Sequence, residues 1–125
     1  MNKVVEPSFQ RGGVYLVQLD PRKGMEVGKL RPCVVVQSDI LNEAGMKTVV
    51  VVPLSSRFQP ETAFLRVQIA AREGLLKPSV ALVEHIRGIS ISRMKPEKLT
   101  QLTESEMDLL FQKLDLMMGR TTSLF

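Results

Sequence analysis

Residues 48–56 of the chain read TVVVVPLSS, and the predicted fold rests on this stretch. Five consecutive Thr or Val residues favour an extended strand, and a run without polar alternation is typical of a strand buried on both faces. Two serines follow Pro53 and Leu54, and they begin a polar loop. We therefore predict a central strand over residues 48–54, with hydroxyl groups just beyond its end.

Four further strands are predicted from short apolar or alternating segments bounded by turn residues. They span residues 14–19, 32–37, 64–69 and 79–91, the last interrupted at Gly88. Residues 20–30 form a long exposed loop in this interpretation, and residues 39–42 form one helical turn. The remaining connections are too short for parallel crossovers, so antiparallel pairing is expected.

One helix is clearly indicated near the end of the chain. Residues 103–106 read TESE, a capping box in which Thr103 and Glu106 each accept from the other's backbone amide. Apolar residues then recur every three or four positions from Met107 to Met118, and Gly119 suits the position just past a helix end. The predicted architecture is a small, strongly curved antiparallel sheet or partial barrel, closed by this C-terminal helix.

Length and composition exclude several classes of protein. The 125 residues suit a single domain, and a hydrophobic content of 44% excludes disorder of the whole chain. One Cys and one His exclude disulfide scaffolds and zinc clusters, so no metal site is predicted. There is no apolar run of the roughly 20 residues that a membrane helix needs, and residues 1–10 lack the apolar core of a signal peptide. We expect a cytoplasmic domain.

The net charge of +4 is unevenly distributed. Residues 1–101 carry 15 basic and 9 acidic side chains, whereas residues 102–125 carry 2 and 4. The acids at 104 and 106 suit the start of a helix, where they stabilise its dipole. The basic side chains gather around residues 22–31 and again between Arg57 and Arg72. Composition alone allows either an ordinary solvated surface or a phosphate-binding face.

Arg31 and Ser55 are the strongest candidates for chemistry. Arg31 precedes a proline that restricts its backbone, and Ser55 follows the central strand. If the two strands pair, an ordered guanidinium and a hydroxyl meet at one edge of the sheet, where they suit a phosphodiester. Cys33 is interpreted as a buried core residue, and His85 as a structural or surface histidine in preference to a general base.

Several motifs, in this order and spacing, resemble the MazF/PemK family of toxin endoribonucleases. They are RGGVYLVQLDP at 11–21, the glycines and acid of 24–28, RPCVVV at 31–36, the strand at 48–56, and SVALVEHIR at 79–87. The resemblance extends over about residues 11–119. It therefore implies an N-terminal extension (1–10), a toxin domain (11–119) and a C-terminal tail (120–125).

The resemblance carries expectations about fold and function. It implies an SH3-like antiparallel β-barrel with a C-terminal α-helix, a homodimer, and a cognate antitoxin that blocks the RNA groove. It implies cleavage of single-stranded RNA without a metal or other cofactor. The RNA 2′-hydroxyl would attack the adjacent phosphorus, leaving a 2′,3′-cyclic phosphate and a 5′-hydroxyl.

The resemblance also assigns roles to individual residues. The family's catalytic arginine falls on Arg31, and its catalytic threonine falls on Ser55, which keeps the hydroxyl. The loop that gates the substrate in this family falls on residues 22–29, between the first two predicted strands. The expected RNA contacts are Lys23, Glu26 and Lys29 from that loop, Arg57 after the central strand, and Glu84, His85 and Arg87 from the late motif.

Two other functions remain open at this point. The CcdB group shares the barrel and poisons DNA gyrase by protein contact, but its contact uses a tryptophan at the helix end, and this chain has no Trp. The other is a catalytically decayed RNA-binding relative, suggested by Ser55, His85 and Gly88 where Thr, Gln and Thr are usual. The pair Arg31-Pro32 favours the nuclease.

Overall fold

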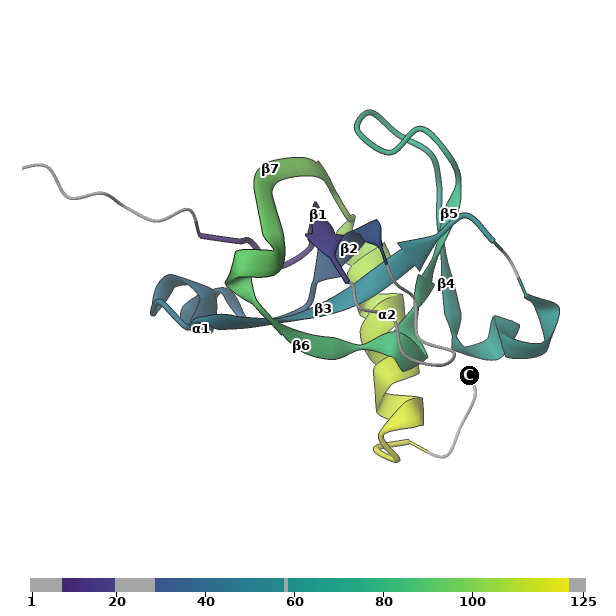
Figure 1. The fold of residues 1–125 in the computed structure, drawn as a ribbon. Helices are drawn as coiled ribbons and strands as arrows, with labels where there is room; N and C mark the ends of the chain where they lie inside the picture. Colours follow the sequence, from purple (N-terminus) through teal and green to yellow (C-terminus); the bar gives the residue numbers. More distant parts are fainter. Residues whose placement is uncertain (1–7, 20–28, 58, 122–125) are drawn as a thin grey trace, which may run out of the picture.

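The computed structural model describes residues 8–19, 29–57 and 59–121 (Figure 1). One antiparallel sheet in the order β4-β5-β3-β2-β1-β7, with β6 paired to β3, forms the body of this part of the chain. Its strands are β1 (Gly13–Gln18), β2 (Leu30–Val35), β3 (Thr48–Ser55), β4 (Arg66–Ile69), β5 (Ser79–Leu82), β6 (Arg87–Ser90) and β7 (Met94–Gln101). The helices are α1 (Asp39–Glu43) and α2 (Glu104–Met117), with 3-10 turns η1 (Pro60–Leu65), η2 (Val83–His85) and η3 (Ile91–Arg93).

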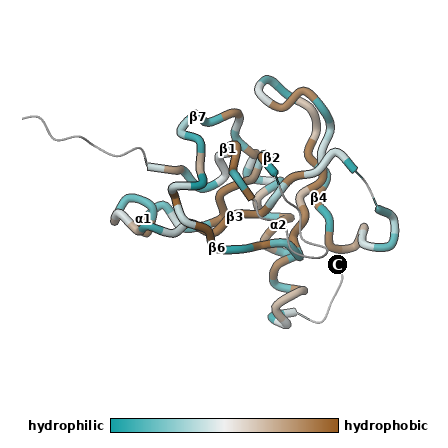
Figure 2. The backbone as a smooth tube through the Cα atoms, viewed as in Figure 1, coloured by the Kyte–Doolittle hydropathy of each residue, from teal (hydrophilic) through white to brown (hydrophobic). Residues whose placement is uncertain are grey.

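The central strand predicted from the valine run is β3. It pairs with β6 along its first half, with β2 in its middle and with β5 at its end. Its valines alternate between two buried clusters, because α2 covers one face of the sheet and residues such as Phe9 and Met94 cover the other. Burial on both faces explains why the run lacks polar alternation, and Figure 2 shows β3 in hydrophobic colours.

The C-terminal helix α2 begins and ends as predicted. The Thr103 amide donates to Glu106 Oε1 at 2.8 Å, and the Glu106 amide donates to Thr103 Oγ1 at 3.1 Å. Met107, Leu110 and Leu114 are buried against the sheet. Gly119 follows the helix with a φ of +78°, the left-handed conformation that glycine adopts most easily. No helix in the described part of the chain is long and apolar enough to cross a membrane.

The strand β7 was not predicted, and its sequence MKPEKLTQ explains why. Among the described strands it lies at an edge and pairs only with β1, with irregular register. Edge strands commonly carry lysines and proline, which block further pairing. These residues remove the apolar alternation on which strand prediction depends.

Two predicted strand boundaries are wrong. The segment 79–91 is broken at the 3-10 turn η2, and Gly88 instead lies inside β6, paired with Val50. Phe64 and Leu65 belong to η1, and β4 begins only at Arg66. Pro60 starts η1 and suits the first turn of a helix, and Phe64 is half exposed there because no strand face buries it.

An ion pair joins the segment after β4 to the start of α2. The Arg72 guanidinium donates to the two Glu106 carboxylate oxygens at 2.8 and 2.5 Å, and to the Gln101 carbonyl at 3.3 Å. Glu106 therefore serves both the helix cap and this pair. Hydrogen bonding from Arg72 lowers the pKa of the Glu106 carboxyl in the folded protein.

Replacing Glu106 with Gln is expected to lower the free energy of unfolding at pH 7 by about 1–2 kcal/mol. Folding lowers the pKa of the Glu106 carboxyl, so its ionised form stabilises the folded protein. This stabilisation is fully present above the unfolded pKa of about 4.3 and is lost as the pH falls through the pKa of the folded protein. Urea unfolding at pH 7 and at pH 3 should show the difference between wild type and Glu106→Gln shrinking at low pH. Glu104→Gln, at an exposed position of the same turn, is the control; an unchanged difference at pH 3 would contradict the assignment.

Candidate functional site

Arg31 and Ser55 lie on neighbouring antiparallel strands, as predicted. The antiparallel β2–β3 register pairs Val35 with Val51 and Cys33 with Pro53. Continuing this register by two residues along each strand places Arg31 opposite Ser55. Both side chains are half-buried. The candidate pair is therefore held by the sheet itself, at the end of β3 and the beginning of β2.

A cavity of about 380 Å³ opens beside this pair. Lys29, Arg31 and Ser55 line it, so three of the predicted site residues share one wall. Ser56, the second serine after the central strand, also lines it. So do Leu76, Lys77 and Ser79, which the sequence analysis did not single out as site residues. The signal that could have found Leu76 and Lys77 is an apolar and a basic residue placed together in the connection between the strands predicted at 64–69 and 79–91.

The Ser55 hydroxyl is oriented by the backbone that follows it. Its Oγ accepts a hydrogen bond from the Arg57 amide at 3.1 Å. Because that bond uses a lone pair, the hydroxyl proton can still be donated to another group. Arg57 is exposed and does not line the cavity.

Arg87 lies on the same face of the sheet as Arg31. Val51 pairs with both Val35 and Arg87, and Cys33 and Arg31 follow Val35 at two-residue steps along β2. Side chains two residues apart share a face. Burial raises the pKa of the Cys33 thiol to about 12, even though the nearby Arg31 and Arg87 charges act to lower it. Cys33 is fully buried, which confirms its prediction as a core residue.

Cys33 is expected to resist thiol reagents in the folded protein. A rise of the pKa from 9.0 to about 12 lowers the thiolate fraction about a thousandfold at pH 8, because only the thiolate reacts. The rate of reaction with a disulfide reagent, measured in buffer and in guanidinium chloride, should therefore rise by at least this factor on unfolding. Comparable rates in the two conditions would show that the thiol is accessible.

Glu84 and His85 lie in η2 and do not line this cavity. The Glu84 carboxylate accepts a hydrogen bond from the Arg66 guanidinium at 2.6 Å, and the Arg66 side chain is only 6% exposed. His85 is half-buried. Neither of these two residues of the late motif lines the cavity that holds Arg31 and Ser55. The structure identifies Arg66 as a partner of Glu84 that the sequence analysis missed.

Two further predicted residues, Lys23 and Glu26, lie outside the described residues. Lys29, at the edge of that segment, has a φ of +66°, an uncommon conformation for a residue with a side chain. Its carbonyl accepts a hydrogen bond from the Leu19 amide at 2.9 Å, so the described residues on either side of the segment are tied together. This backbone bond helps to place Lys29 at the cavity.

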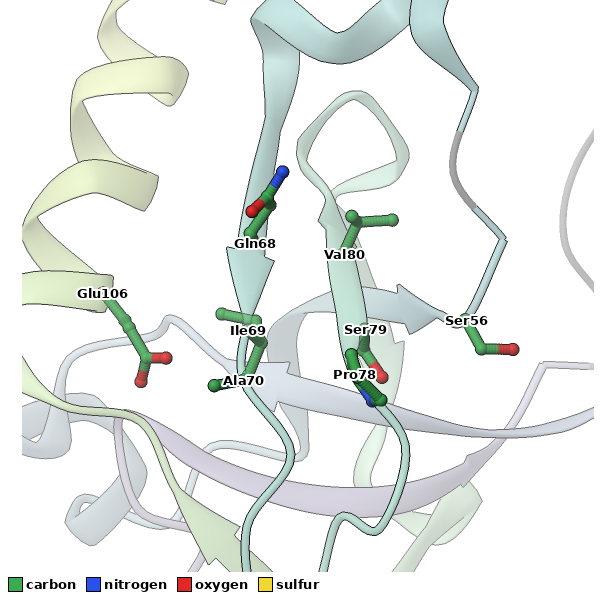
Figure 3. Close-up of a pocket in the computed structure, with 8 residues that line it drawn as sticks. All are labelled: Ser56, Gln68, Ile69, Ala70, Pro78, Ser79, Val80 and Glu106. Carbon is green, nitrogen blue, oxygen red and sulfur yellow. The ribbon is translucent and has the colours of Figure 1, made fainter.

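A second cavity of about 440 Å³ adjoins the first (Figure 3). Ser56 and Ser79 line both cavities, and Gln68, Val80 and Glu106 line only the second. Glu106 comes from α2 at the opposite side from Ser56 in Figure 3. The two hollows therefore meet at the serines beside the end of β3.

The polar side chains that line the first cavity are mainly hydrogen-bond donors. Lys29, Arg31 and Lys77 supply positive charge, and Ser55 and Ser56 supply hydroxyls. Such a set can bind phosphate oxygens and stabilise negative charge on them. Within residues 8–19, 29–57 and 59–121, no group of three or more His, Cys, Asp or Glu side chains is arranged to hold a metal ion.

Sequence comparison finds relatives over most of the chain. Endoribonuclease MazF of Staphylococcus saprophyticus is 36% identical over 115 residues, which are 91% of this chain and 94% of that protein. Endoribonuclease MazF of Staphylococcus epidermidis is 38% identical over 112 residues, 89% of this chain and 92% of that protein.

Solved structures share the fold. MazF of Deinococcus radiodurans superposes with a TM-score of 0.74 at 22% identity, covering 87% of this chain and 94% of that chain. Toxin MazF-mt6 of Mycobacterium tuberculosis gives a TM-score of 0.71 at 19% identity, covering 86% and 96%. These similarities confirm the predicted fold, a mainly β antiparallel architecture with a C-terminal helix, although β4 and β7 end an open sheet among the described strands.

The family predicted from the sequence motifs is confirmed by a third comparison. Residues 10–118 match the sequence model described as PemK-like, MazF-like toxin of type II toxin-antitoxin system. The match includes β1 to β7 and all of α2. The chain belongs to this family of PemK-like, MazF-like toxins.

Proposed function

We propose that this chain is the toxin of a toxin–antitoxin pair and acts as an endoribonuclease on single-stranded RNA. The observation that carries the proposal is the placement of Arg31 and Ser55 on paired strands at one cavity, beside Lys29. The name of the staphylococcal relatives, Endoribonuclease MazF, supports the reaction class.

In the proposed reaction, the RNA 2′-hydroxyl attacks the adjacent phosphorus and the bond to the 5′ oxygen of the next nucleotide breaks. The attacking hydroxyl loses a proton and the leaving oxygen takes one up, so the products are a 2′,3′-cyclic phosphate and a 5′-hydroxyl. A guanidinium stays protonated in proteins, so Arg31 acts by stabilising the negative charge that develops on the phosphate oxygens. Ser55 donates its hydroxyl proton to one of those oxygens or to the attacking group.

The RNA path follows the positive side chains around the cavity. Lys29 lines the cavity near Arg31, and Arg57 is exposed two residues after Ser55, so both are proposed to bind neighbouring phosphates. Lys23 and Glu26 are proposed to contact RNA from the segment before Lys29. Glu84, His85 and Arg87 are proposed to contact bases or phosphates farther along the same strand of RNA.

The proposed partners follow from the relatives. One neighbouring structure is an endoribonuclease in complex with its cognate antitoxin from a mycobacterial species, and another is MazE-MazF from Deinococcus radiodurans. We therefore propose that this chain forms a homodimer and binds an antitoxin over the RNA site. We further propose that the single-stranded RNA substrate is messenger RNA and that the chain acts in the cytoplasm.

Incubation of the purified protein with mixed single-stranded RNA in EDTA tests the function. Cuts at defined short sequences, with 5′-hydroxyl ends, are expected. RNA left intact, together with gyrase-dependent breaks in plasmid DNA, would contradict the nuclease and favour a CcdB-like poison. Intact RNA that is nevertheless bound would indicate a catalytically decayed relative.

A further inference from the structure

The loop between β4 and β5, residues 70–78, extends beyond the ends of these two strands (Figure 1), and a bridge closes the turn at its middle. Arg72 and Leu75 form a bridge in which each amide donates to the other's carbonyl at 2.9 Å. Gly74 adopts a φ of +86° and lies against β7 so closely that a Cβ there would come within 1.8 Å of the Leu99 carbonyl oxygen. Only glycine fits this approach.

Side chains anchor the same loop. Leu75 is buried in the core beneath α2, and Arg72 is bound to Glu106 and to the Gln101 carbonyl. Backbone and side-chain contacts thus hold this loop against two other elements, α2 and β7. A loop with such contacts presents its remaining side chains from a fixed position, which lowers the entropy cost of binding.

The loop presents Leu76 and Lys77. Leu76 is 87% exposed, the highest value among the large apolar residues in the described part of the chain, and Lys77 is exposed beside it. Both line the cavity that holds Arg31 and Ser55. Figure 2 shows both hydrophobic and hydrophilic colours along this projecting loop.

We propose that Leu76 and Lys77 contact the RNA substrate, with Lys77 binding a phosphate near the scissile one and Leu76 packing against the face of an unpaired base. This inference rests on the proposed function. An apolar side chain and an ammonium group side by side match the two surfaces of a nucleotide, its base and its phosphate. The described part of the chain contains the aromatic residues Phe9, Tyr15, Phe64 and Phe111. None of these four lines this cavity, and among the described residues Leu76 supplies an exposed aliphatic surface for a base.

The shared cavity favours RNA over a protein partner as the occupant. Lys29, Arg31 and Lys77 place positive charge around Leu76, and a buried protein interface is normally depleted of lysine. RNA carries negatively charged phosphates and bases with apolar faces, so it can contact the three basic side chains and Leu76 at the same time. The loop would then fix the position of the nucleotide next to the reacting phosphate.

Binding of a substrate that cannot react tests this inference separately from catalysis. The probe is a fluorescein-labelled pool of random-sequence RNA heptamers with 2′-fluoro ribose, which lacks the attacking hydroxyl. Fluorescence anisotropy compares the full chain with Leu76→Ala and Lys77→Ala. Met118→Ala and Lys95→Ala, at exposed positions that do not line the cavity, are the matched controls.

We expect Lys77→Ala to weaken binding about fivefold and to reduce the slope of log affinity against log salt by about 0.7, as loss of one phosphate contact does for a single strand. Leu76→Ala should weaken binding about tenfold with an unchanged salt slope, and the controls should match wild type. In cleavage of the corresponding 2′-hydroxyl RNA, both loop variants should raise KM more than they lower kcat.

Three outcomes would separate the inference from the proposed function. Wild-type affinity in both loop variants would overturn the inference while leaving the nuclease intact. If the wild-type protein does not cleave RNA but both loop variants bind RNA more weakly than wild type, the inference is supported and the proposed nuclease function is contradicted. If Leu76→Ala leaves RNA affinity unchanged but shifts the sedimentation coefficient, Leu76 belongs to an interface between copies and the inference is overturned.

Discussion

Arg31→Ala is expected to lower kcat for RNA cleavage about a thousandfold, the range seen when a group that stabilises transition-state charge is removed. The Arg31 side chain lies at the start of β2, lines the cavity and has Ser55 on the neighbouring strand. Its charge is needed where the phosphorus becomes five-coordinate. Single-turnover cleavage of a labelled oligonucleotide measures the effect.

Two further variants serve as controls for the Arg31→Ala result. Arg31→Lys keeps the charge but loses the fork of donors, so its kcat should fall between those of wild type and Arg31→Ala. Arg120→Ala removes an exposed arginine at the far end of α2 and should cleave at the wild-type rate. A thermal midpoint of Arg31→Ala within a few degrees of wild type would show that the fold is retained. Cleavage by folded Arg31→Ala within threefold of the wild-type rate would remove Arg31 from the mechanism.

Glu84→Ala is expected to lower the free energy of unfolding by about 3 kcal/mol, because it leaves the buried Arg66 charge without its partner. The Arg66 side chain is 6% exposed, and its Nε has no hydrogen-bond partner among the described residues. Urea unfolding at pH 7 measures the loss. Asp108→Ala, at an exposed acid on α2, should change stability by less than about 0.5 kcal/mol.

The double variant Arg66→Met, Glu84→Leu separates two roles for Glu84. Apolar residues of similar size remove both buried charges together, so the double variant should recover most of the stability that Glu84→Ala loses. If Glu84 also contacts RNA, as proposed, this stable protein should still bind RNA more weakly than wild type. A double variant as unstable as Glu84→Ala would show that the ion pair is not the cause of the loss.

The sequence predicts the elements whose residue pattern comes from their own burial or from their own local hydrogen bonds. The valine run of β3 is buried on both faces, and the capping box of Thr103 and Glu106 is satisfied within a single turn. These signals lie within short stretches of sequence, so they can be recognised without knowledge of the fold. The edge strand β7 was missed because its charged and proline residues serve to prevent pairing and do not mark a strand.

The candidate site was predictable only where it follows strand register. Arg31 and Ser55 come together because β2 and β3 pair, which their adjacent positions in the sequence favour. Leu76 and Lys77 reach the same cavity through long-range contacts of Gly74 and Arg72 with β7 and α2. Glu84 bonds to Arg66, 18 residues away. No local pattern encodes such contacts, so Arg66, Leu76 and Lys77 were found only in the structure.

Cleavage of one oligonucleotide with a single altered ribose tests the central claim most directly. After the cut site has been mapped, the nucleotide on its 5′ side is replaced by its 2′-deoxy form in an otherwise unchanged RNA, and the products are resolved in EDTA. We predict that the unmodified RNA yields a 2′,3′-cyclic phosphate and a 5′-hydroxyl, and that the deoxy substitution abolishes the cut at that position alone. Continued cleavage at the deoxy position, or a 5′-phosphate on the product, would contradict attack by the RNA 2′-hydroxyl at Arg31 and Ser55.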